Sequence, residues 1–211
     1  YTGRTTQGLQ AVAAGYQAGL TTQGSYATAV GGFAGNSNQG SNTVATGYQA
    51  GKTTQGTYAT AVGEASGNSN QGAHATAVGS RAGLTSQGTY AVAVGREAGE
   101  TTQGTQAVAV GHKAGETSQG ANGVIISATG AALDDTSTGH IHIASNQGEL
   151  KFTSAGGWEM IDGGVTNLTV NPAGNVGIGT TSPTTALDVT GTVTATAFVG
   201  DGSGLTNVVP G

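Results

Sequence analysis

The sequence predicts an all-β solenoid, and three observations support this fold class. A sixteen-residue unit repeats without insertion from Thr5 to about Gly120, and its first copy reads TTQGLQAVAAGYQAGL. Short stretches such as residues 106–110 alternate with period two, which belongs to strands and not to helices. The chain also has 40 Gly and only 5% aromatic residues, which suits a fibrous protein better than a globular core. Since an exact short period makes each copy one turn of a stack, the units form successive coils.

Glutamine forms the most regular column of the repeat, and a glycine follows each glutamine. The glutamines are Gln7, Gln23, Gln39, Gln55, Gln71, Gln87, Gln103 and Gln119. Neighbouring strands stack about 4.8 Å apart, so these amides are expected to form a hydrogen-bonded ladder, each donating to one neighbour and accepting from the other. The alternative is that each glutamine side chain caps the backbone of its own turn.

The strand of each unit has a Val/Thr face and an Ala face. Rows of alanine beside three glycine columns indicate a coil too flat to hold large side chains. Such a coil buries little apolar area, and this burial is not expected to offset the conformational entropy lost on folding. We therefore expect several chains to share the core. The Val/Thr row is the predicted inter-chain seam, although a one-residue register error would exchange the faces. The seam residues singled out are Val92, Val94, Val108 and Val110.

The string AVAVGREAG at residues 91–99 resembles the head repeats of trimeric autotransporter adhesins of the Yersinia adhesin A type. That resemblance implies a homotrimeric, left-handed parallel β-roll over residues 1–120, with three chains packed about a common axis. The usual repeat of that family is slightly shorter, so the residues that carry the T-x-Q-G turn are a departure.

Residues 121–165 are predicted to form a small β-meander. Strands are expected at 139–143, 149–152 and 158–161, with turns between them. The pattern resembles modules that recur in phage tail fibres, where they cap or join trimeric segments.

Residues 166–211 include PAGNVGIGTTSP from position 172 and GDGSGLTN from position 200. They resemble tail-fibre shaft and neck segments, which implies an intertwined β shaft. The chain starts without an initiator Met, so we expect it to be a piece of a longer protein. Its end at Val209-Pro210-Gly211 suggests a truncation, a processing site or the base of a missing tip.

Composition argues against several classes of function. Six basic residues and a net charge of −5 offer no patch for a nucleic acid. The absence of Cys removes disulfides and thiol chemistry, and no long apolar run predicts membrane insertion. No residue set suggests catalysis, so an enzyme is not expected. The expected location is extracellular, on a bacterial surface or in a virion fibre.

One candidate metal site stands out in the sequence. His140 and His142 lie two apart and so share a strand face, and three chains would bring six imidazoles together. Resemblance to phage tail-fibre tips implies an octahedral metal on the trimer axis. The alternative is that Ile141 and Ile143 take the inward face and the histidines face solvent. No other cofactor is expected. The lone Trp158 is read as a hydrophobic plug, or else as a platform for a sugar.

The leading functional hypothesis is a homotrimeric surface fibre, whose partners are two copies of itself and a cell-surface glycan or envelope component. Variable turns and the residues Tyr26, Tyr58 and Tyr90 are what a ligand would meet, unless they are simply solvated turns. One alternative is ice or mineral binding through a Thr/Ser column at positions 5, 21, 37, 53, 69, 85 and 101. Another is a phage tail fibre that recognises a host.

Overall fold

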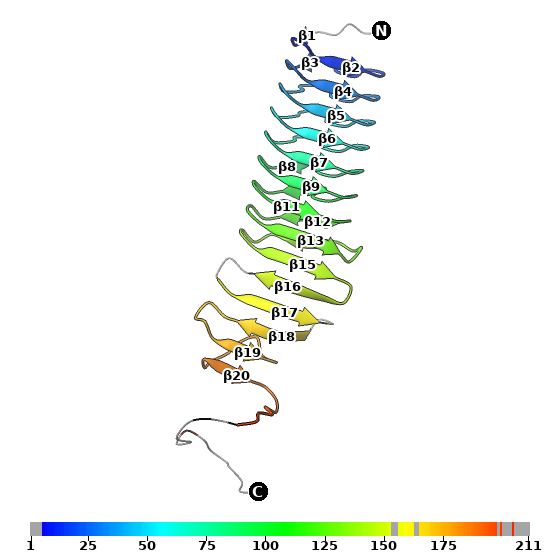
Figure 1. Cartoon of the computed structure of the whole chain (residues 1–211). Helices are drawn as coiled ribbons and strands as arrows, with labels where there is room; N and C mark the ends of the chain where they lie inside the picture. The colour runs from blue at the N-terminus through cyan, green and yellow to red at the C-terminus, as the bar shows by residue number, and fades with distance from the viewer. Residues whose placement is uncertain (1–5, 153–155, 163–164, 198, 200–203, 205–211) are drawn as a thin grey trace.

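A computed structural model describes residues 6–152, 156–162, 165–197, 199 and 204. Over these residues the protein is all-β, with no helix. Strands stack one above the next from β2 at one end to β20 at the other, and the result is a rod (Figure 1). One 14-stranded sheet runs through the whole stack, and a second sheet lies beside it in the solenoid.

The solenoid has about nine turns with sixteen-residue spacing. Each turn gives one strand to the long sheet, and the strands pair in parallel, so that Val92 lies beside Val108. These strands are β2 (Val12–Ala14), β4 (Thr28–Val30), β5 (Val44–Thr46), β6 (Thr60–Val62), β7 (Thr76–Val78), β9 (Val92–Val94), β11 (Val108–Val110), β13 (Val124–Ala128) and β15 (Ile141–Ser145).

In each repeat the glutamine lies in a second strand of two residues or in a single bridge, except that β12 has six residues. In β14, beyond the repeats, Asp135 takes the place of the glutamine. Where no strand is assigned, bridges between successive glutamines continue the pairing from Gln23 to Gln87. The strands on this side are β1 (Thr6–Gln7), β3 (Thr22–Gln23), β8 (Ser86–Gln87), β10 (Thr102–Gln103), β12 (Ala114–Gln119) and β14 (Leu133–Asp135).

Alanine lines the interior of the coil. Ala77, Ala93 and Ala109 lie in register on successive strands and are fully buried. The glycine columns let backbones stack closely, because a Cβ added at Gly95 would lie 2.6 Å from the carbonyl oxygen of Gly111. Gly95 also has φ +127°, a conformation that side chains rarely tolerate. The coil is thus as flat as the Ala and Gly rows indicate.

The solenoid does not end at residue 120, where the sequence analysis placed a boundary. Strand β13 pairs in parallel with β11, and β15 pairs in parallel with β13. The larger Ile125 continues the buried alanine row, and the repeat lengthens by one residue between Val124 and Ile141. Because the longer turn keeps its strand in register, the stack continues through β15 although the repeat sequence has ended.

The rest of the long sheet is mostly antiparallel. Strands β16 (Gly148–Phe152), β17 (Trp158–Asp162), β18 (Val165–Val170) and β19 (Val176–Ile178) pair in order, and β20 (Leu187–Val189) then pairs in parallel with β19. The three strands expected in the meander are present, but the first also closes the solenoid. The expected boundary at 165 is also absent from the sheet, since β18 and β19 continue it. Most of the GDGSGLTN segment and the chain end lie outside the described residues.

Candidate functional site

The outward face of the long sheet exposes many of its apolar side chains. On strand β9, Ala93 points inward and is fully buried, whereas Val94 is 36% exposed. The four seam residues predicted from the sequence all lie on this outward face. Register places Val92 beside Val108 and Val94 beside Val110, so they belong to two columns.

Both columns continue beyond the repeats to the end of the sheet. One passes through Val94, Val110, Ile126, Ile143, Leu150, Met160, Leu168, Ile178 and Val189. The other passes through Val92, Val108, Val124, Ile141, Phe152, Trp158, Val170, Val176 and Leu187. Met160 is 48% exposed and Ile178 45%, so the apolar stripe stays open in the antiparallel part. Trp158 stands in this stripe beside Phe152, a position that suits a hydrophobic plug.

The glutamine side chains lie inside the coil and bond both to one another and to the backbone. Gln71, Gln87 and Gln103 each donate from Nε2 to the Oε1 of the next glutamine, over 3.1 Å. Gln39 donates likewise to Gln55 over 3.2 Å. The same Nε2 atoms also donate to carbonyl oxygens of the preceding coil. Those of Gln71, Gln87 and Gln103 donate as well to a carbonyl oxygen of their own coil, as the capping alternative requires.

The ladder is incomplete. The Oε1 atoms of Gln23, Gln39 and Gln71 are buried without a hydrogen-bond partner. Gln7, in the first coil, is exposed, and its Nε2 donates to the carbonyl of Ala11.

His142 points into the coil. Its ring continues the inward row after Ile125 and is buried, whereas Ile141 and Ile143 point outward and are 37% and 43% exposed. The histidine therefore lies on the face opposite the valine columns. If three chains met along the valine face, a metal on their common axis would not reach His142. The predicted valine seam and the predicted axial metal at His142 are therefore incompatible in this structure.

A partly buried group of titratable residues surrounds His142. The Oδ2 atom of Asp135 lies 2.9 Å from His140 Nδ1 and 3.5 Å from His142 Nδ1, and Lys151 Nζ is 4.0 Å from it. Glu149 Oε1 is 2.6 Å from His142 Nε2. Burial lowers the pKa of His142, reinforced by the positive charges of Lys151 and His140 and opposed by the carboxylates.

The pKa of Asp135 is lowered as well. Burial acts to raise this pKa, but hydrogen bonds from the backbone N–H of Ser137 and from His140 outweigh it. The charged form of Asp135 is therefore the one that the fold stabilises.

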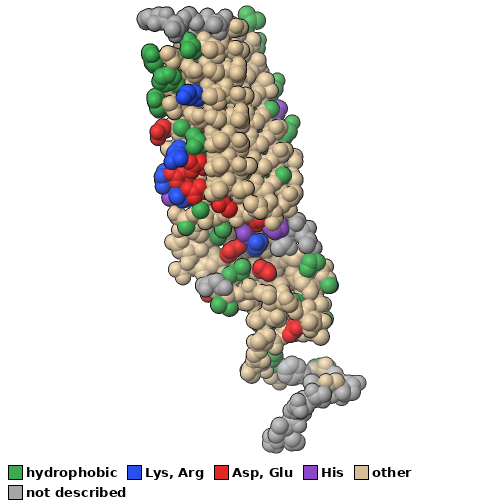
Figure 2. Space-filling view, turned by 180° about the vertical axis from the view of Figure 1, so that it is seen from behind, with side chains coloured by type: hydrophobic (Ala, Val, Ile, Leu, Met, Phe, Trp, Pro, Cys, Tyr) green, Lys and Arg blue, Asp and Glu red, His purple; other side chains and the backbone are tan. Residues whose placement is uncertain are grey.

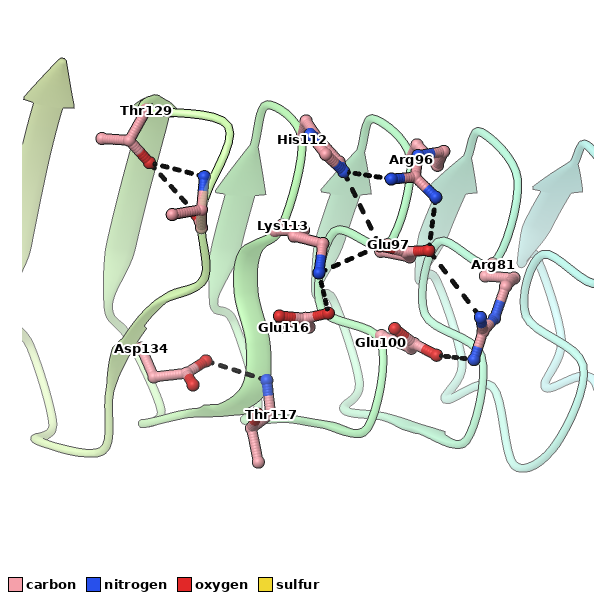
Figure 3. Close-up of polar contacts among 11 residues, drawn as sticks. Arg81, Arg96, Glu97, Glu100, His112, Lys113, Glu116, Thr117, Thr129 and Asp134 are labelled. Carbon is pink, nitrogen blue, oxygen red and sulfur yellow. Dashed lines mark hydrogen bonds and ion pairs between the residues drawn. The ribbon is translucent and has the colours of Figure 1, made fainter. Parts of the chain in front are cut away.

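A second polar cluster lies on one edge of the solenoid, in its last repeats (Figure 3). Glu97 is almost buried and lies between cations from three coils: Arg81 at 3.7 Å, Arg96 at 2.6 Å and Lys113 at 3.6 Å. Arg81 also pairs with Glu100. From the sequence, these positions were expected to be solvated turns. The signal that predicts the contact is the sixteen-residue spacing of Arg81, Glu97 and Lys113, which stacks opposite charges on successive coils.

Three carboxylates of this ion-pair network, those of Glu97, Glu100 and Glu116, place ligand atoms within 4.8 Å of one another. Each is already paired with a cation, and Lys113 Nζ lies 2.9 Å from Glu116. The hydrogen bond to Glu116 raises the pKa of Lys113, and this effect outweighs burial, which acts to lower it. Figure 2 shows red and blue atoms interspersed here, so the cluster neutralises itself.

The predicted ligand-contact tyrosines lie on the surface. Tyr58 and Tyr90 stack on either side of His74, with ring centroids 4.9 and 4.8 Å apart. Tyr26, at the same position of an earlier coil, is also exposed. His74 occupies one face of each of the Tyr58 and Tyr90 rings, which remain more than half exposed.

Four hydroxyls of the Thr/Ser column proposed for ice binding are bonded within the protein. Thr21 and Thr53 donate from Oγ1 to carbonyl oxygens of the next coil, at 3.2 and 3.0 Å. Ser37 and Ser69 donate to asparagine side chains. These hydroxyls are not arranged as a free ladder for a lattice.

Comparisons with known proteins returned no match to a family model, to a curated protein or to a solved structure. Among the described residues, no helix has the length and apolarity to span a membrane.

Proposed function

We propose that the chain is one third of a homotrimeric surface fibre, in which the outward face of the long sheet forms the inter-chain seam and the sides of the rod meet a cell-surface glycan or envelope component. The observation that carries the proposal is the continuity of the two outward columns through the long sheet: they hold Val, Thr and one Ala from β2 to β7, and they are apolar throughout from β9 to β20. A stripe of this length on a soluble surface marks an interaction site.

Composition supports a copy of the same chain as the occupant of the seam. The apolar side chains buried inside the repeats are all alanine, so the larger aliphatic side chains of the outward face contribute to stability only when another surface covers them. Identical repeats present identical columns, and a closed cyclic assembly lets each column meet its equivalent. Three chains and a left-handed coil are what the resemblance of residues 91–99 to adhesin heads implies.

An axial metal at His140 and His142 is not part of this proposal. His142 is buried inside the coil, with carboxylate oxygens of Asp135 and Glu149 within ion-pair distance of its ring nitrogens. At the level of these histidines the proposed seam carries the apolar side chains of Ile141 and Ile143.

Two measurements test the proposal separately. Mass photometry of the full chain is expected to give three times the 20.3 kDa chain mass, and a stable β-rich monomer would exclude the trimer. Binding of fluorescently labelled trimer to intact bacterial and animal cells, before and after enzymatic removal of surface glycans, tests adhesion. Binding that glycan removal leaves unchanged would point to a protein component of the envelope.

A further inference from the structure

An aromatic patch lies on the same edge of the solenoid as the ion-pair network, in the first three coils. Tyr16, Phe33 and Tyr48 form it, together with the polar side chains Gln17, Gln49 and Lys52. Figure 2 shows hydrophobic side chains with a basic one on this edge, above the charged cluster.

The fold does not require aromatic residues here. The position of Phe33 is taken by Ala65, Arg81, Glu97 and Lys113 in later coils, all with φ between 50° and 62°. Because the backbone is the same with any of these side chains, the aromatic rings are a local feature that repeat stacking does not explain.

The tyrosine rings are held but not covered. Phe33 meets Tyr16 at 5.3 Å and Tyr48 at 6.0 Å, both nearly perpendicular, so the rings contact by their edges. Tyr16 remains 69% exposed and Tyr48 52%.

Polar groups flank the rings. Gln17 and Gln49 each donate from Nε2 to the hydroxyl of the adjacent tyrosine, over 3.3 and 3.4 Å. Their amide oxygens and the tyrosine hydroxyls are left to bond a ligand at each end of the patch. The two tyrosines are two coils apart, roughly 9–10 Å at the usual strand spacing.

Lys52 gives the patch its charge. Its Nζ lies 5.9 Å from the centre of the Phe33 ring, and no carboxylate pairs with it among the described residues. The other basic side chains of the described part all pair: Arg81, Arg96, Lys113 and Lys151. An unpaired cation beside open aromatic rings suits an anionic ligand with an apolar face.

We infer that the aromatic patch binds a glycan with carboxylated pyranose units, the class that contains uronic and sialic acids. Pyranose C–H groups pack on Tyr16 and Tyr48, the amides bond the hydroxyl groups, and the carboxylate lies at Lys52. The spacing of the two tyrosines is close to one disaccharide of an extended chain. This inference rests on the proposed role as a surface fibre and names the ligand class of that role.

The test is a glycan array probed with the full-length trimer, carrying sialylated and uronic-acid oligosaccharides beside their neutral counterparts. Wild-type protein is expected to prefer the carboxylated glycans. The double variant Tyr16→Ala/Tyr48→Ala is expected to lose about tenfold or more in affinity. Lys52→Gln is expected to lose the preference for acidic over neutral glycans, and Lys52→Arg to keep it.

The matched control is Tyr58→Ala/Tyr90→Ala, which removes two tyrosines of similar exposure from another column. Glycan binding that survives the Tyr16/Tyr48 change but not the control change would overturn the inference and leave the proposed function standing. A wild-type trimer that binds no glycan would overturn the inference, and the cell-binding measurement would then decide whether the proposed function stands. Light scattering on each variant completes the test, because loss of the trimer in the Tyr16/Tyr48 variant would assign the patch to the seam instead.

Discussion

Gln87 Nε2 lies 3.1 Å from Gln103 Oε1 in the next coil and 2.7 Å from the carbonyl oxygen of Thr76 in the preceding coil. One amide nitrogen therefore ties three coils together inside the solenoid. Since Gln87 Oε1 also accepts from Gln71, the side chain uses both ends of its amide. The ladder and the backbone cap, posed as alternatives from the sequence, coexist at this residue.

Gln87→Leu is expected to destabilise the fold by about 1–3 kcal/mol per chain, because it removes these bonds and leaves buried partners without them. Urea unfolding followed by circular dichroism measures the change. Gln147→Leu, at an exposed bend outside the column, is the control and should change little. Equal effects of the two substitutions would show that the buried amide contributes nothing specific.

Val108→Asp tests the seam. The side chain points out of the coil, so a monomer would tolerate aspartate, whereas a trimer would bring three charges into an apolar contact at a cost of several kcal/mol. Mass photometry across a dilution series should show dissociation at higher concentrations than in wild type. Thr102→Asp, exposed on the second sheet where Asn38 and Asn70 are natural residues, should leave assembly unchanged. A Val108→Asp protein that assembles like wild type would place the seam elsewhere.

Ala93→Leu tests how flat the coil is. Ala93 is fully buried between Ala77 and Ala109, and the added carbons have no space unless strands separate, at about 1–3 kcal/mol or more. The melting temperature is expected to fall. Thr105→Leu is the control, because Leu9 occupies the same position of the first coil, largely exposed. An unchanged melting temperature for Ala93→Leu would mean that the interior has free volume.

His142 predicts a pH dependence of stability. Because its pKa in the folded state is lowered from 6.5, the unfolded chain binds more protons below that value. Stability is thus full above pH 6.5 and falls as the pH drops through the lower folded pKa, by about 1.4 kcal/mol for each unit of the shift. Melting temperatures between pH 7.5 and 5 should show this decline.

The variant His142→Gln should flatten the decline, whereas His74→Gln, on the surface, should not. The lowered pKa of Asp135 contributes stability above its ordinary value of 3.8, which is lost as the pH falls through the folded pKa, so a separate drop belongs there. If His142→Gln keeps the wild-type decline between pH 7.5 and 5, another group is responsible for it.

The sequence alone determined the repeat, the stacking and the two faces of each strand. Exact sixteen-residue spacing requires Val92 to lie beside Val108, and alternation separates Val94 from the buried Ala93. These features are local or periodic, so they can be predicted from the amino-acid sequence alone. The same sixteen-residue spacing also brings Arg81, Glu97 and Lys113 into contact. Because residues vary at this position of the repeat, the sequence analysis took it for a solvated turn and did not predict the contact.

Tertiary structure decided what lies beyond the period. Which face His142 takes depends on the register between β13 and β15, and no repeat fixes that register across the longer turn. The continuation of the sheet through β16 to β20 likewise depends on pairing between segments with no shared pattern. Side-chain direction in a strand reverses with a shift of one residue, so these faces follow from the paired strands and not from composition.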